Sequence, residues 1–124
     1  MIKAMFLAGL GGAIGTCLRY LTGRLCNLFV VGGFPLATFV VNVVGSLFIG
    51  LLFGLGERHH AFSHAASALL ITGFCGGFTT FSSFANDIYM LMQGRHWPML
   101  IFYALLSLVL GVGMVCLGRW LVKG

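Results

Sequence analysis

The chain is a succession of four long apolar segments separated by short links. The segments extend over about residues 3–26, 35–55, 64–92 and 98–122. A helix needs about 20 mostly apolar residues to cross the hydrocarbon core of a bilayer. Only helices and closed barrels can pair all of their own backbone N–H and C=O groups in that environment. The pattern therefore predicts an all-α integral membrane protein, in which residues 1–124 form a single domain of four transmembrane helices.

The third segment contains a stretch that an uninterrupted helix avoids. Residues 72–84 hold three glycines, followed by the adjacent pair Thr79 and Thr80, and glycine is a poor helix former. Non-helical backbone at membrane depth persists only where protein or a water-filled cavity satisfies its N–H and C=O groups. We therefore predict that the third helix is broken in mid-membrane at about residues 73–80, and that the freed carbonyls and hydroxyls line a functional feature.

Polar and small residues form one narrow stripe on the second segment and another on the fourth. The stripes repeat every fourth residue and consist of Thr38, Asn42 and Ser46, and of Tyr103, Ser107 and Gly111. Such residues ordinarily join helices to one another in membranes. A buried amide is nevertheless costly unless it meets a partner or a permeant species. The spacing alone leaves Asn42 equally a helix contact and a pathway residue.

The first segment combines a packing face with two late arginines. The spacing of Gly11 and Gly15 is typical of a face that another helix approaches closely. We interpret Arg24 as an anchor at the membrane interface. Arg19 lies close to the far interface, where it is either a second anchor or a residue that faces an aqueous vestibule and attracts anions.

Phe81 and Phe84 are three residues apart, so on a helix they share a face. Aromatic residues at this spacing usually pack in a core. The edge of a phenylalanine ring carries positive partial charge, however, and can face an anion without offering it a proton. Both roles stay open on spacing alone.

Composition narrows the function classes. The chain is 60% hydrophobic and 7% charged, whereas a soluble domain is about a quarter charged. Its net charge is +5, but the basic residues are scattered and form no patch of the kind that nucleic-acid binding requires. We therefore expect a lipid bilayer around the chain and no nucleic-acid partner.

Potential metal ligands form no convincing side-chain cluster. The four cysteines lie separately in apolar runs without a CxxC pair, and we expect them to be small buried hydrophobic residues. Glu57 lies close to His59, His60 and His64, but no further cysteine or carboxylate stands at ligand spacing. We interpret residues 56–63 as an interfacial loop, and the pattern assigns these histidines no role.

The distribution of basic residues predicts how the chain inserts. Four segments place both termini on one side of the membrane, with four basic residues on that side and three on the other. Because a bias in Lys and Arg fixes orientation, this near balance predicts insertion in both orientations. Two oppositely oriented copies would pair about a two-fold axis in the membrane plane, as a dual-topology antiparallel homodimer.

The lack of charge in mid-membrane indicates what kind of species crosses. Apart from the marginal Arg19, no acidic or basic residue lies there, whereas coupled transporters usually keep an ionisable residue in the membrane. The pathway candidates are an amide, hydroxyls and aromatic edges. They suit passive passage of a small, partly dehydrated ion, and they do not name that ion.

Three motifs together resemble the Fluc/CrcB family of fluoride channels. They are Gly12-Ala-Ile-Gly-Thr-Cys-Leu-Arg-Tyr20, Phe34-Pro-Leu-Ala-Thr-Phe-Val-Val-Asn-Val-Val-Gly-Ser46 and Gly73-Phe-Cys-Gly-Gly-Phe-Thr-Thr-Phe-Ser-Ser-Phe84. The resemblance covers essentially the whole chain in length, segment number and motif order, and the third motif is highly specific. It implies a multi-pass protein of the bacterial cell (inner) membrane. It also implies a dual-topology antiparallel homodimer that lets cytoplasmic fluoride leak out passively and so lowers fluoride toxicity.

The resemblance also implies roles for individual residues. Asn42 corresponds to the pore asparagine, and Phe81 and Phe84 to the phenylalanines whose ring edges line the ion path. The residues Ser83, Tyr103 and Ser107 are expected along the same path. A structural sodium ion is expected at the dimer interface, bound by the main-chain carbonyls of Gly76 and Thr79 from both copies.

Other classes of function fit the residues less well. A small proton-coupled exporter would be expected to carry a glutamate in its first helix, and the first segment has none. A structural subunit would explain the glycines but not the Asn42 stripe or the Phe81–Phe84 pair. An enzyme is disfavoured because the sequence holds no nucleophile–base pair, metal cluster or phosphate-binding loop.

Overall fold

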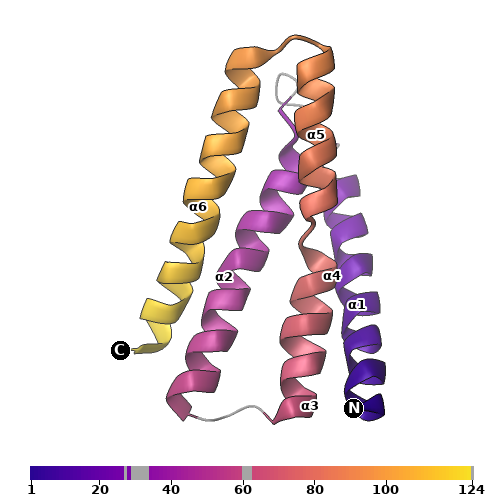
Figure 1. Ribbon diagram of the computed structural model, residues 1–124, viewed down its shortest axis with the longest axis vertical. Helices are drawn as coiled ribbons and strands as arrows, with labels where there is room; N and C mark the ends of the chain where they lie inside the picture. Colours follow the sequence, from indigo (N-terminus) through magenta and orange to yellow (C-terminus); the bar gives the residue numbers. More distant parts are fainter. Residues whose placement is uncertain (27, 29–33, 60–62, 124) are drawn as a thin grey trace.

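The computed structural model describes residues 1–26, 28, 34–59 and 63–123, and all the regular structure in these ranges is helical. Four stretches are long and apolar enough to cross a membrane: Ile2–Cys26, Leu36–Glu57, His64–Gln93 and Trp97–Val122. The predicted all-α class and the number of candidate spans are therefore confirmed. Both termini lie at the same end of the molecule, as four spans require (Figure 1).

Three of the spans are continuous helices and the third is a stack of shorter ones. The continuous helices are α1 (Ile2–Cys26), α2 (Leu36–His59) and α6 (Trp97–Lys123). The stack consists of α3 (His64–Ser67), the π-helical η1 (Ala68–Cys75), α4 (Gly76–Phe78) and α5 (Phe81–Gln93). Helix α2 lies between α6 and this stack, and α1 packs mainly against η1 and α4 (Figure 1).

Glycines allow the backbones of α2 and α6 to meet. A Cβ atom added to Gly118 would lie 2.6 Å from the carbonyl oxygen of Leu47, and one added to Gly50 would collide with the backbone of Val115. At the end of this contact Arg119 forms an ion pair with Glu57 at 2.9 Å. Both side chains are largely exposed, so the pair contributes at most about 1 kcal/mol. Close backbone packing therefore joins these two helices.

The predicted packing face of α1 is confirmed. Gly11 and Gly15 are both buried, and a Cβ atom at either would collide with the backbone of the third span. The approach is equally close from the other side, because a Cβ atom at Gly77 would lie 2.5 Å from the carbonyl oxygen of Gly12. Small residues on both elements let their backbones touch, as is common between helices in membranes.

This packing changes the interpretation of the third segment. Residues 73–78, which we expected to be non-helical, lie in η1 and α4, and the extended residues are Thr79 (φ −86°, ψ 158°) and Thr80 (φ −151°, ψ 117°). The physical reason is that Gly73 and Gly77 serve close approach to α1 rather than unwinding. The proposed break in mid-membrane stays a prediction.

Two smaller expectations also need correction. Helix α2 continues through His59, so Glu57 is helical, and the predicted loop does not begin at residue 56; His60 lies outside the described residues. Cys17 and Cys116 are exposed on the protomer, whereas Cys75 is buried as expected. The outer faces of α1 and α6 carry many exposed apolar residues, and these two cysteines belong to the same faces.

Candidate functional site

The site is organised around the two extended residues between α4 and α5. The hydroxyl of Thr79 donates to the carbonyl of Cys75 at 2.9 Å, which closes the preceding turn. Thr80 is the N-cap of α5, because its Oγ1 accepts the N–H of Ser83 at 3.1 Å. Such a cap satisfies one of the backbone donors that a helix start leaves unpaired. Side-chain caps of this kind fix the geometry of the linker on both sides.

Asn42 of α2 holds the same linker from the side. Its Nδ2 donates to the carbonyl of Thr80 at 3.0 Å, and its Oδ1 accepts the Thr80 N–H at 2.8 Å. The pair satisfies both backbone groups of a residue that lies outside a helix. A carboxamide carries two N–H groups, so one N–H of Asn42 has no partner among the described residues and is open to a further one.

A hollow of about 330 Å³ opens between α2, α5 and α6, and we call it the α2–α6 hollow. Its lining brings together residues from three helices and from the linker: Asn42, Ser46, Ile49, Thr79, Thr80, Phe81, Phe84, Ser107, Leu108 and Gly111. Four of the six predicted pathway residues, namely Asn42, Phe81, Phe84 and Ser107, therefore share one cavity. Its polar groups are one amide and several hydroxyls.

Ser107 supplies an unusual feature of this hollow. Its hydroxyl oxygen is buried and has no hydrogen-bond partner within the described part of the chain. Most buried polar side-chain atoms in folded proteins are paired. Because Ser107 lines the hollow and its hydroxyl has no partner among the described residues, it is a candidate contact for a species that enters the cavity.

The two phenylalanines of the hollow lie in different surroundings. The Phe81 side chain is 79% exposed on the protomer, whereas Phe84 is half-buried and packs against Tyr103 with ring centroids 5.2 Å apart. The rings of Phe81 and Phe84 are 6.1 Å apart and tilted by 44°. The two rings are therefore neither stacked face to face nor perpendicular to each other.

Tyr103, which the family resemblance places along the ion path, lies in the interior of the protomer. The side chain is fully buried, and its hydroxyl donates to Oδ2 of Asp87 at 3.0 Å. It also packs against the ring of Phe84, and its own place along an ion path stays a prediction. Sequence reasoning missed the role of Asp87, since a contact between residues 87 and 103 leaves no periodic signal.

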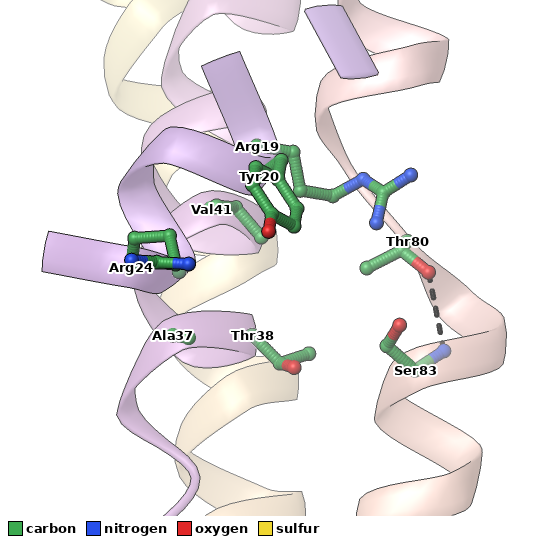
Figure 2. Close-up of a pocket in the computed structure, with 9 residues that line it drawn as sticks. Arg19, Tyr20, Arg24, Ala37, Thr38, Val41, Thr80 and Ser83 are labelled. Atoms are coloured by element: carbon green, nitrogen blue, oxygen red, sulfur yellow. Dashed lines mark hydrogen bonds between the residues drawn. The ribbon is translucent and has the colours of Figure 1, made fainter. Parts of the chain in front are cut away.

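A second hollow, of about 240 Å³, lies between α1, α2 and α5, and we call it the α1–α2 hollow. Figure 2 shows Thr38 projecting toward Ser83 and the Arg19 side chain extending toward the linker near Thr80. Nε of Arg19 donates to the carbonyl of Gly77 at 3.0 Å. Thr80 lines both hollows, so the linker contributes to the wall of each.

Gly76 and Thr79, the two residues expected to hold sodium, lie at the start of α4 and in the linker that follows it. Gly76 is exposed, and the nearest atom to a Cβ built there is the carbonyl oxygen of Ile71, 4.0 Å away. The backbone of Thr79 is extended, so its carbonyl does not continue the turn of α4. Within the described ranges no group of three or more His, Cys, Asp or Glu side chains could hold a metal ion.

These features define a multi-pass membrane protein whose polar hollows are lined by neutral side chains and arginines. The chain belongs to the CrcB-like family (camphor resistance), whose sequence model matches residues 6–119, and this confirms the family resemblance. It is 42% identical to the fluoride-specific ion channel FluC of Azobacteroides pseudotrichonymphae over 99% of this chain and 98% of the relative. It is 43% identical to the FluC of Flavobacterium psychrophilum over 98% of both chains. The FluC of Leptospira interrogans (serovar copenhageni) is 35% identical over 98% of this chain and 95% of its own length.

The relatives establish the general class of this protein. The relatives are named as ion channels, and the kinship is not with enzymes. With four candidate spans, the chain is a multi-pass bacterial membrane protein.

Proposed function

We propose that this chain is a fluoride-selective passive channel that exports cytoplasmic fluoride down its electrochemical gradient and so lowers fluoride toxicity. The observation that carries the proposal is the α2–α6 hollow. It combines an amide N–H, an unpaired Ser107 hydroxyl and the rings of Phe81 and Phe84. The identity of the ion, fluoride, is inferred from the names of the relatives.

The chemistry of the hollow suits a small anion. The free N–H of Asn42 and the hydroxyl of Ser107 donate hydrogen bonds, and the positive ring edges replace part of the hydration shell. Because none of these groups is charged, the anion is held weakly enough to leave, as conduction requires. A full positive charge in the same place would retain it.

The placement of Asp87 supports passive movement of the anion. Asp87 accepts the Tyr103 hydroxyl behind Phe84 and does not line the α2–α6 hollow. A passive pore still exports the ion, because the neutral acid enters the cell across the lipid and the anion formed inside is trapped. Opening a path for the anion then lets it leave without coupling to another ion.

We propose further that the channel is an antiparallel homodimer. Each copy would expose the same linker, which lies about midway along the His64–Gln93 span, to the centre of the membrane. The exposure of Gly76 beside that linker supports a contact with a second copy. Near-balanced basic residues on the two sides support insertion in both orientations.

A structural sodium ion at the centre of this dimer completes the proposal. The carbonyls of Gly76 and Thr79 from both copies would supply hard oxygen ligands, and the ion would join the two linkers. Support comes from the open space beside Gly76 and from the extended backbone of Thr79.

The direct test is ion efflux from liposomes that contain the purified protein, recorded in parallel with fluoride and chloride electrodes. We expect rapid loss of fluoride with chloride retained. If folded protein released neither ion, the channel would be excluded. Equal release of both ions would exclude the selectivity.

A further inference from the structure

We propose that Arg19 is a positioning residue whose Nε–H holds the carbonyl of Gly77 and thereby keeps the Thr79–Thr80 linker extended between the two hollows. Its effect on conduction rests on the proposed channel function, but its effect on the linker does not. The role differs from both roles that the sequence suggested for Arg19, an interfacial anchor and an attractor of anions.

The linker interrupts the hydrogen bonds of a continuous helix. In a continuous helix the carbonyl of Gly77 would accept the N–H of Phe81, four residues further on. Thr79 and Thr80 are extended, and α5 begins anew at Phe81. The Gly77 carbonyl thus lies at the end of α4, where helix carbonyls lack partners of their own helix.

Arg19 supplies the missing donor from another helix. Its Nε lies 3.0 Å from the carbonyl oxygen of Gly77, and the contact is partly buried. Arg19 can reach it because Gly77 and Gly12 bring α4 and α1 into backbone contact. An unsatisfied carbonyl at membrane depth is strongly unfavourable, so this bond favours the chain path that leaves α4 at Phe78.

Asn42 performs the matching task on the next residues. It pairs with the N–H and C=O of Thr80 from α2, whereas Arg19 holds Gly77 from α1. The linker is therefore held from two helices. Because Thr80 lines both hollows and Phe81 follows it directly, a shift of the linker would move the lining of the ion path.

The competing role for Arg19 depends on its charge and not on Nε. Arg19 and Arg24 both line the α1–α2 hollow, where two positive charges would attract an anion. A variant that keeps the donor but removes the charge separates the two roles. Gln places Nε2 as many bonds from Cα as Nε is in Arg, and Met has the same reach with no donor.

The experiment compares Arg19→Gln with Arg19→Met in fluoride efflux and in the ¹³C chemical shift of the Gly77 carbonyl. We expect Arg19→Met to lower efflux by roughly tenfold or more, since a hydrogen bond to a charged group is lost, and to shift the Gly77 resonance. Arg19→Gln should restore most of the efflux and keep the resonance near its original position. Arg24→Gln reports the effect of removing one charge from the same hollow.

The possible outcomes decide between the roles. If Arg19→Gln and Arg19→Met lose efflux equally while the Gly77 resonance stays in place, Arg19 acts through its charge and the proposal is wrong. If Arg19→Met does not fold but Arg19→Gln folds with the resonance unmoved, the rescue by a neutral donor supports it. If the original protein conducts no fluoride, the channel proposal fails, and the Gly77 resonance still tests Arg19.

Discussion

Asn42 and Thr80 are joined by two hydrogen bonds, in which the side-chain amide of one residue pairs with both backbone groups of the other. The distances are 3.0 Å from Nδ2 to the carbonyl oxygen and 2.8 Å from the N–H to Oδ1. The residues are 38 positions apart in sequence. A side-chain amide can donate and accept at the same time in this way. The pair thus serves as a helix contact and, through its remaining N–H, as part of the proposed path.

Asn42→Asp is expected to abolish fluoride flux. The carboxylate can still accept the Thr80 N–H, but it cannot donate to the Thr80 carbonyl, which costs about 1–3 kcal/mol if that group is left unpaired. It also places a negative charge where an anion must pass. Efflux from liposomes and thermal unfolding in detergent measure the two effects separately. Thr22→Val, which alters only a local bond within α1, controls for handling, and undiminished flux in Asn42→Asp would remove Asn42 from the path.

Ser107→Ala is expected to stabilise the protein and to slow conduction. The hydroxyl has no partner within the described residues, and an unpaired buried polar group costs about 1–3 kcal/mol. Replacing it with a methyl group therefore raises the unfolding temperature while removing a donor from the α2–α6 hollow. A lower unfolding temperature would show that the hydroxyl has a structural partner. Unchanged efflux would place it outside the path.

Phe81→Ile and Phe84→Ile are expected to reduce fluoride flux while dimers persist, but with different effects on stability. Phe84 packs on Tyr103, so its replacement loses an aromatic pair worth about 0.5–1.5 kcal/mol. Phe81 is mostly exposed on the protomer, so its replacement leaves the protomer's stability nearly unchanged. Efflux, unfolding temperature and subunit counting by photobleaching distinguish the effects.

A matched control for Phe81 is available on α1. Phe6 is 76% exposed, close to the 79% of Phe81, and lines neither hollow. Phe6→Ile should therefore conduct normally. Loss of the dimer in Phe81→Ile would mean that this ring packs against the second copy instead of lining the path.

The sequence was sufficient for the features that depend on local pattern. Span number follows from the length of the apolar runs, and the packing face at Gly11 and Gly15 follows from their spacing. Glycine has two uses, however, and sequence does not distinguish close approach from unwinding. For that reason the expected non-helical stretch, residues 73–80, is too long, because Gly73 to Phe78 are helical and only Thr79 and Thr80 in it are extended.

The features that depend on tertiary pairing could not be predicted. Polar stripes mark Asn42 as important but do not identify the backbone of Thr80 as its partner. In the same way, a late arginine predicts an anchor or a vestibule, whereas Arg19 donates to a carbonyl 58 residues away. Each pairing depends on how closely α1 and α2 approach the third span, and glycines at several positions jointly set that approach.

Gly76→Ala provides the sharpest test of the proposed dimer. Gly76 has helical dihedral angles (φ −63°, ψ −36°) and is exposed. Space for a Cβ is open within the protomer, since the nearest atom lies 4.0 Å away. Alanine is a better helix former than glycine by about 0.8–1.0 kcal/mol, so the protomer should be as stable as before or slightly more so.

If Gly76 faces a second copy across the proposed sodium site, the added methyl group should nevertheless lower the dimer fraction in lipid, measured by subunit counting. Gly113→Ala is the matched control, because Gly113 is also a helical, exposed glycine with no atom within 4 Å of an added Cβ, and it should dimerise normally. Equal dimer fractions in the two variants would place the interface away from Gly76. A fall in both would show that the lipid-facing side of α6 also contacts the partner.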